Sequence, residues 1–96
     1  MNQPEASLQR RRFEGRAAIV TGSGGGIGEA YVRALHAEGA SVVVAEINEK
    51  AGRAVAESLG ERAIFVRTDV GDPASTDAMA AAVMESFGRI DYLVNN

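Results

Sequence analysis

A glycine-rich stretch, residues 21–28, follows a short apolar run at residues 17–20 and precedes a segment of helical spacing. Its glycines at Gly22, Gly26 and Gly28 give the spacing G-x-x-x-G-x-G, and no frame of the stretch gives the commoner G-x-G-x-x-G. Gly22 can turn the chain at a positive φ, Gly26 can let the backbone approach a pyrophosphate, and Gly28 can let a helix pack closely on a sheet. Because backbone N–H groups point out of a helix N-terminus, the stretch predicts a phosphate-binding loop.

Beyond this stretch, short apolar runs alternate with segments of helical spacing. Further strands are predicted at residues 41–45, 63–66 and 90–94. Helices are predicted over residues 26–38, 49–59 and 73–87. Because strands that alternate with helices connect through right-handed crossovers, every strand is expected to be parallel, in the order 3-2-1-4. The chain is therefore predicted to have an α/β fold with the element order β-α-β-α-β-α-β.

Particular residues refine the predicted helices. Two residues are expected to cap helix N-termini, Asn48 and Asp72. Glycines are expected to end the three helices, at Gly39, Gly60 and Gly88. The buried face of the first helix is predicted to consist of Ile27, Ala30, Tyr31, Ala34 and Leu35. Core positions are also predicted for Met79 and Met84.

Length and composition limit the class of protein. At 96 residues the chain is one domain or part of one, because independent domains most often have about 100–150 residues. The absence of cysteine excludes disulfides, thiolate zinc sites and cysteine nucleophiles, and without a secretory signal it predicts a cytoplasmic protein. His36 is the only histidine, so no metal site is expected. No apolar run approaches the ~20 residues that span a bilayer, so no membrane partner is expected.

Residues 1–12 lack periodicity and are predicted to be a flexible leader before a folded part at residues 13–96, with Phe13 as the first residue to pack. Three consecutive arginines at residues 10–12 are compatible with a nucleic-acid-binding arm or an import signal. Such a run in a short polar tail is more typical of a solvated leader. Residues 17–96 carry six basic and eleven acidic side chains, so no nucleic-acid partner is expected.

The glycine spacing, with Thr21 ahead of it and Ile27 inside it, resembles that of the short-chain dehydrogenase/reductase family. Four further segments keep the family's order: residues 15–22 resemble its first strand, 42–46 its second strand with a terminal acid, 69–70 its adenine-pocket pair, and 91–96 the start of its Asn-Asn-Ala-Gly element. The resemblance covers residues 13–96. It implies a Rossmann-type doubly wound parallel sheet, of which this chain is the truncated N-terminal portion, a partial NAD-binding domain.

Cofactor contacts are implied by the resemblance at the loop residues Gly22, Ser23, Gly24, Gly25, Gly26, Ile27 and Gly28. Glu46 ends the second predicted strand, where the acidic residue of a dinucleotide-binding fold accepts hydrogen bonds from the adenosine ribose. Its carboxylate would repel a 2′-phosphate, and neither residues 23–25 nor Ile47 supplies a basic side chain. NAD is therefore predicted in preference to NADP. The alternative for Glu46 is a solvated acid at a strand end.

Two further contacts are implied near the ends of the third and fourth strands. Asp69 and Val70 resemble the family's adenine-pocket pair, although an aspartate at a strand end is also a common turn former. Asn96 resembles the family's cofactor-contacting asparagine, and Asn95 its strand-end partner. A plain polar turn is the alternative for both asparagines.

Family members transfer protons with a Tyr-x-x-x-Lys pair, which these 96 residues lack. Tyr31 is followed four places on by Leu35, and Tyr92 by Asn96, while the only lysine is Lys50. No catalytic residue is therefore predicted. The resemblance implies the cofactor-binding part of an NAD(H)-dependent oxidoreductase for an alcohol or carbonyl substrate, which forms a homo-oligomer, a dimer or tetramer, at full length. This chain alone is expected to be inactive.

Two other function classes are alternatives to this hypothesis. A free-standing NAD-binding or regulatory module without a catalytic half would carry the same motifs. A phosphate-loop nucleotidase is excluded, because no Gly-Lys-Ser or Gly-Lys-Thr follows the glycines.

Overall fold

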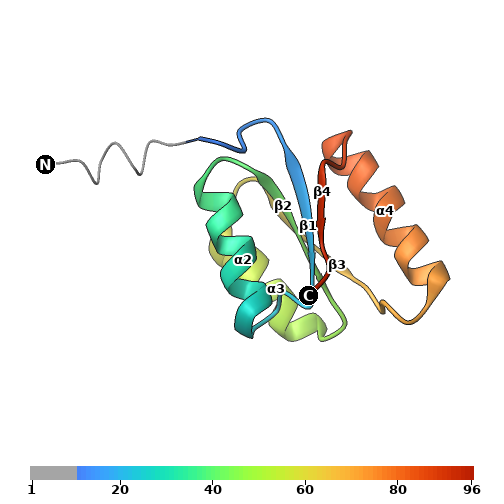
Figure 1. Ribbon diagram of the computed structural model, residues 1–96. Helices are drawn as coiled ribbons and strands as arrows, with labels where there is room; N and C mark the ends of the chain where they lie inside the picture. Colours follow the sequence, from blue (N-terminus) through green and yellow to red (C-terminus); the bar gives the residue numbers. More distant parts are fainter. Residues whose placement is uncertain (1–10) are drawn as a thin grey trace, which may run out of the picture.

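The computed structural model describes residues 11–96, which form a four-stranded sheet with helices on both faces (Figure 1). The strands are β1 (Ala17–Thr21), β2 (Ser41–Glu46), β3 (Ala63–Arg67) and β4 (Tyr92–Val94). The helices are α2 (Gly26–Ala37), α3 (Glu49–Leu59) and α4 (Pro73–Phe87). All strand pairs are parallel and the order is β3-β2-β1-β4, so the predicted Rossmann-type topology is confirmed.

The two central strands are covered on both faces. Every residue of β1 and the four inner residues of β2 are buried, as expected for near-continuous apolar runs in a parallel sheet. The core between the sheet and helices α2 and α3 is built mainly of valines: Val20, Val32, Val42, Val44 and Val55. The core beneath α4 contains Ile19, Val43, Ala45, Met79 and Val83. This packing fixes β1 and β2, whose carboxyl ends carry the candidate site.

The predicted helix ends are found in the structure. Asn48 caps α3 by accepting a hydrogen bond from the N–H of Ala51 at 3.0 Å. Asp72 caps α4 by accepting one from the N–H of Ala74 at 3.1 Å. Gly88 ends α4 in the left-handed conformation, with φ of +76°, which few residues other than glycine adopt.

The buried face of α2 differs from the prediction. Of the predicted face only Leu35 packs against the core, as predicted. Ile27 and Tyr31 are 67% and 49% exposed, Ala30 and Ala34 are also exposed, and Gly28 and Val32 are buried instead. Residues 28, 32 and 35 are also spaced as one helical face, so apolar spacing alone did not distinguish the two faces. The close approach of Gly28 to the end of β1 decides which face turns inward.

Two smaller predictions also need correction. Met84 is 49% exposed and is not a core residue, whereas Met79 is buried as predicted. The fourth strand begins at Tyr92, and Ile90 lies before it. Asp91 also precedes the strand, although its N–H already donates to the carbonyl of Ala17 at 2.9 Å.

Most of the predicted leader, residues 1–10, lies outside the described residues. Arg12 donates two hydrogen bonds to Glu38, at 2.5 and 2.6 Å. Phe13 packs against the core and meets the ring of Tyr92 edge-on, with 5.6 Å between the ring centroids. In the part of the chain that the structure describes, no helix is long and apolar enough to cross a membrane.

Candidate functional site

The glycine loop, residues 22–28, joins β1 to the first turn of α2 at the carboxyl edge of the sheet (Figure 1). Gly22 and Gly26 adopt φ of +64° and +59°, a region that residues with a Cβ rarely enter. The hydroxyl of Ser23 is buried and donates to the carbonyl of Val20 at 2.7 Å, so this side chain faces the strand. The loop therefore presents mainly its backbone to the outside.

Helix α2 begins without a capping side chain. Gly25 occupies the N-cap position in an extended conformation, and within residues 11–96 no side-chain hydrogen bond caps this helix end. A Cβ on Gly25 or Gly26 would meet no atom within 4 Å, so the approach to the helix end is open. Free N–H groups and the helix dipole favour an anion at such a position.

Asn96 connects the glycine loop to the end of β4. Its side-chain Nδ2 donates to the carbonyl of Gly22 at 3.2 Å, and its backbone N–H donates to Oγ1 of Thr21 at 3.0 Å. A Cβ on Gly28 would lie 2.6 Å from Asn96 Nδ2 and would overlap the carbonyl oxygen of Gly22. Asn95 Oδ1 lies 3.4 Å from the same threonine hydroxyl. Thus both asparagines lie beside the loop, and Gly28 leaves the space that this requires.

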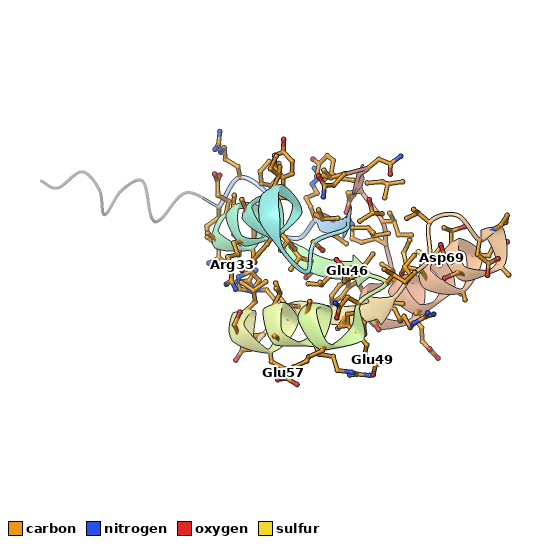
Figure 2. The ribbon with its side chains drawn as sticks, turned by 90° about the horizontal axis from the view of Figure 1, so that it is seen from below. Arg33, Glu46, Glu49, Glu57 and Asp69 are labelled. Carbon is orange, nitrogen blue, oxygen red and sulfur yellow. The ribbon has the colours of Figure 1, made fainter. Side chains whose placement is uncertain are left out.

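Glu46, the last residue of β2, lies between α2 and α3 when the carboxyl edge is seen end-on (Figure 2). Its Oε1 accepts a hydrogen bond from the N–H of Gly24 at 2.9 Å, and its Oε2 accepts one from the N–H of Asn48 at 3.0 Å. Glu49 and Glu57 instead point outward from α3 (Figure 2). Two backbone donors therefore fix the Glu46 carboxylate beside the glycine loop.

Asp69 and Val70 follow β3 in a tight turn before α4. Asp69 Oδ1 accepts from the N–H of Gly71 at 3.0 Å, and the Asp69 N–H donates to Ser75 Oγ at 2.9 Å. The aspartate therefore shapes the turn, in agreement with its alternative interpretation as a turn former. Val70 is 62% exposed, and its side chain is free to contact a ligand.

A cavity of about 140 Å³ brings five of the predicted residues together: Gly22, Glu46, Asp69, Val70 and Asn96. Residues 23–28 do not line it and lie along the adjoining loop. Sequence reasoning did not assign three other lining residues, Thr21, Ile47 and Thr68. Each lies next to a predicted residue at a strand end. Thr21 also belongs to the glycine motif and Ile47 follows the acid of the second strand, whereas adjacency to Asp69 is the signal for Thr68.

A metal centre has no evident place among residues 11–96, where no group of three or more His, Cys, Asp or Glu could hold an ion. His36 Nε2 lies 2.6 Å from the carbonyl oxygen of Glu61, at the end of α2 remote from the glycine loop. The candidate site is therefore an arrangement of backbone donors, the carboxylates of Glu46 and Asp69, and exposed apolar side chains.

Comparison with known proteins identifies the family. Residues 16–96 match the family model for short chain dehydrogenases. The chain belongs to the short chain dehydrogenase family. The order of its motifs and the topology of its sheet are those expected for this family, whose members are oxidoreductases.

Curated short chain dehydrogenases resemble the chain over most of its length. Sorbitol dehydrogenase of Cereibacter sphaeroides is 45% identical over 85 residues, which are 88% of this chain and 33% of the relative. The 3-beta-hydroxysteroid dehydrogenase of Comamonas testosteroni is also 45% identical over 85 residues, 88% of this chain and 34% of the relative. The chain thus spans about a third of the length of these enzymes.

Solved structures of the family share the fold. The 3-ketoacyl-(acyl-carrier-protein) reductase of Brucella melitensis, in complex with NADH, is 33% identical with a TM-score of 0.83, over 84% of this chain and 33% of the reductase. A short chain dehydrogenase of Burkholderia phymatum, in complex with NAD, is 36% identical with a TM-score of 0.82, over 84% of this chain and 30% of that enzyme.

Proposed function

We propose that residues 13–96 form the NAD(H)-binding part of an oxidoreductase that transfers hydride to or from an alcohol or carbonyl substrate. Two of the structural neighbours hold NADH or NAD, and two of the relatives are sorbitol and 3-beta-hydroxysteroid dehydrogenases, whose names describe alcohol oxidation. The site residues of this chain suit a dinucleotide. Their assignment to particular parts of that cofactor belongs to the same proposal.

The glycine loop would hold the pyrophosphate. The N-terminus of α2 has no capping side chain among the described residues, and its dipole favours a negative charge there. Gly26 would let the phosphates come close, because no side chain occupies the open space beside it.

The observation that carries the proposal is the position of the Glu46 carboxylate. Each oxygen already accepts one backbone hydrogen bond and keeps a lone pair for a ribose hydroxyl. A 2′-phosphate at that place would bring a second anion against a fixed carboxylate, so NAD(H) is favoured over NADP(H). The exposed side chains of Ile47 and Val70 would flank the adenine in the adjoining cavity.

A bound nicotinamide supplies or accepts the hydride, whereas proton transfer requires a general acid or base. These 96 residues contain no Tyr-x-x-x-Lys pair, so the chain's own contribution is to bind and orient the cofactor.

The proposal is tested by titrating NADH and NADPH separately into the protein and measuring each dissociation constant by calorimetry. Tighter binding of NADH supports the proposal. Equal or tighter binding of NADPH would exclude the assignment of Glu46.

A second candidate is a module that binds NAD without catalysis, because the glycine loop and the Glu46 carboxylate would serve such a module equally well. An alcohol-oxidation assay with NAD+ on the complete gene product that carries these residues separates the two functions. Turnover supports the oxidoreductase, and NAD binding without turnover of any alcohol supports the module.

A further inference from the structure

The side chain of Glu46 fills the space that a side chain on Gly24 would need. A Cβ built on Gly24 would lie 2.8 Å from Cγ, 2.9 Å from Oε1 and 3.0 Å from Cδ of Glu46. Gly24 does not adopt a positive φ, so its backbone conformation does not require glycine. The position of the Glu46 side chain is therefore the reason that a side chain at residue 24 does not fit.

The stem of Glu46 is confined on its other side by α3. A Cβ on Gly52 would lie 3.1 Å from the Cβ of Glu46 and would overlap the ring of Phe65. Glu46 thus lies between two glycines, one against its carboxylate and one against its stem. A side chain at residue 24 would therefore displace the carboxylate from its present place beside the glycine loop.

The carboxylate is held by backbone donors. The N–H groups of Gly24 and Asn48 each donate one hydrogen bond to it, and within residues 11–96 no arginine or lysine forms an ion pair with it. Its placement relative to the loop therefore depends on the distance between the chain at Gly24 and the end of β2. The absence of a side chain at residue 24 permits this short distance.

We propose that Gly24 is a specificity-determining positioning residue, which holds the Glu46 carboxylate where it accepts the adenosine ribose hydroxyls and excludes a 2′-phosphate. This role rests on the proposed function, because it acts through Glu46 on the choice between NAD and NADP. It assigns the choice of cofactor to a pair of residues 22 positions apart.

The first test compares cofactor selectivity, the ratio of the dissociation constants for NADPH and NADH. Gly24→Ala displaces the carboxylate and removes a hydrogen bond to a charged group, so we expect the ratio to fall roughly tenfold. Glu46→Ala lowers the ratio by itself, and adding Gly24→Ala to that variant should change it no further. Glu57→Ala is the control: it removes a carboxylate that points outward from α3, so the ratio should stay at the wild-type value (Figure 2).

The second test needs no cofactor. In a ¹H–¹⁵N NMR spectrum, the amide resonance of Gly24 should move when Glu46→Ala removes its acceptor. It should stay in place in Glu57→Ala, which removes an outward-pointing carboxylate of α3 (Figure 2). An unmoved Gly24 resonance in Glu46→Ala would overturn the proposed contact.

The outcomes separate the two proposals. If the protein binds NADH selectively and Gly24→Ala leaves the ratio unchanged, the role of Gly24 is wrong and the proposed function stands. A ratio that falls further when Gly24→Ala is added to Glu46→Ala would show that residue 24 does not act through the carboxylate. If the wild-type protein binds neither dinucleotide, the proposed function and the specificity role both fail, whatever the Gly24 resonance shows.

Discussion

Asp91 accepts a hydrogen bond from the backbone N–H of Ala17 at 2.8 Å, which ties the approach to β4 to the first residue of β1. Arg89 donates two further hydrogen bonds to the same carboxylate, at 2.7 and 2.8 Å, and Arg16 lies 3.5 Å away. The hydrogen bonds from Arg89 and Ala17 hold the pKa of Asp91 well below its ordinary value. This cluster lies at the amino edge of the sheet, opposite the candidate site.

The first prediction concerns stability in acid. Because the pKa of Asp91 is lower in the folded chain, its stabilisation is complete above the unfolded value of about 3.9 and is lost as the pH falls through the folded value. Asp91→Asn should therefore lower the melting temperature at pH 7 and weaken its decline below about pH 4. Thermal melts from pH 7 to pH 2 measure both effects, with Glu57→Gln as the control. The prediction would be contradicted if the melting temperatures of the wild type and Asp91→Asn declined equally between pH 7 and pH 2.

The second prediction concerns the glycine loop. Gly26→Val should abolish NADH binding, because a branched side chain would fill the open space beside the N-terminus of α2. It should also cost about 1–2 kcal/mol of stability, since Gly26 adopts a φ of +59°. Gly88→Val is the matched control, because Gly88 has a φ of +76° and open surroundings but lies at the end of α4. Calorimetric titration should show binding in the control only, and unchanged affinity in Gly26→Val would mean that the loop is not the phosphate site.

The third prediction is a change of cofactor preference. Glu46→Ala combined with Ile47→Arg removes a repulsive charge and adds a phosphate partner at a residue that is 51% exposed and lines the cavity. The NADPH-to-NADH ratio of dissociation constants should fall by at least roughly tenfold. Ile47→Arg alone serves as the comparison, and it should have a smaller effect while the carboxylate remains. A double variant that keeps the wild-type preference would rule out the assignment of Glu46.

The fourth prediction tests the packing of α2 on the end of β1. Gly28→Ala should destabilise the protein by about 1–3 kcal/mol, because its Cβ would overlap the carbonyl oxygen of Gly22 and press on Asn96. Gly25→Ala places a methyl group in open space in the same loop and should have a much smaller effect. Chemical denaturation of both variants gives the comparison. Equal stability would show that the loop rearranges without cost.

The fifth prediction concerns the isolated 96-residue chain. It should have no dehydrogenase activity, because it lacks a Tyr-x-x-x-Lys pair, and it should self-associate through β4, where Leu93 is 59% exposed at the sheet edge. Leu93→Lys should raise the monomeric fraction in light scattering coupled to gel filtration. A wild-type chain that is monomeric and oxidises an alcohol with NAD+ would contradict both parts.

Much of the fold follows from local signals. The alternation of apolar runs and helical segments, with caps at Asn48 and Asp72, predicts the strand order, because right-handed crossovers leave few alternatives. The buried face of α2 was predicted correctly at Leu35 and wrongly at Ile27 and Tyr31, which match the helical period as well as Val32 does. Only the contact of the helix with β1 distinguishes these faces, and that contact is tertiary.

The sequence predicts which residues belong to the candidate site better than it predicts the hydrogen bonds between them. The spacing of the glycines and the acid at the end of β2 locate Glu46, but its hydrogen bond from Gly24 spans 22 residues and has no local signature. The inward turn of the Ser23 hydroxyl likewise depends on the carbonyl of Val20 at the end of β1. The cofactor roles of these residues remain predictions.

The bond between Asn96 and Gly22 joins positions 74 residues apart. Bringing residues so far apart together lowers the conformational entropy of the chain. Contacts between the intervening strands offset this loss, so the bond forms after these strands have paired. The glycine loop is encoded early in the chain, yet one of its contacts comes from Asn96, which follows β4. During synthesis, the ability to bind a dinucleotide would therefore arise after the sheet has formed, and a nascent chain that has made only β1 and α2 would not yet hold the cofactor.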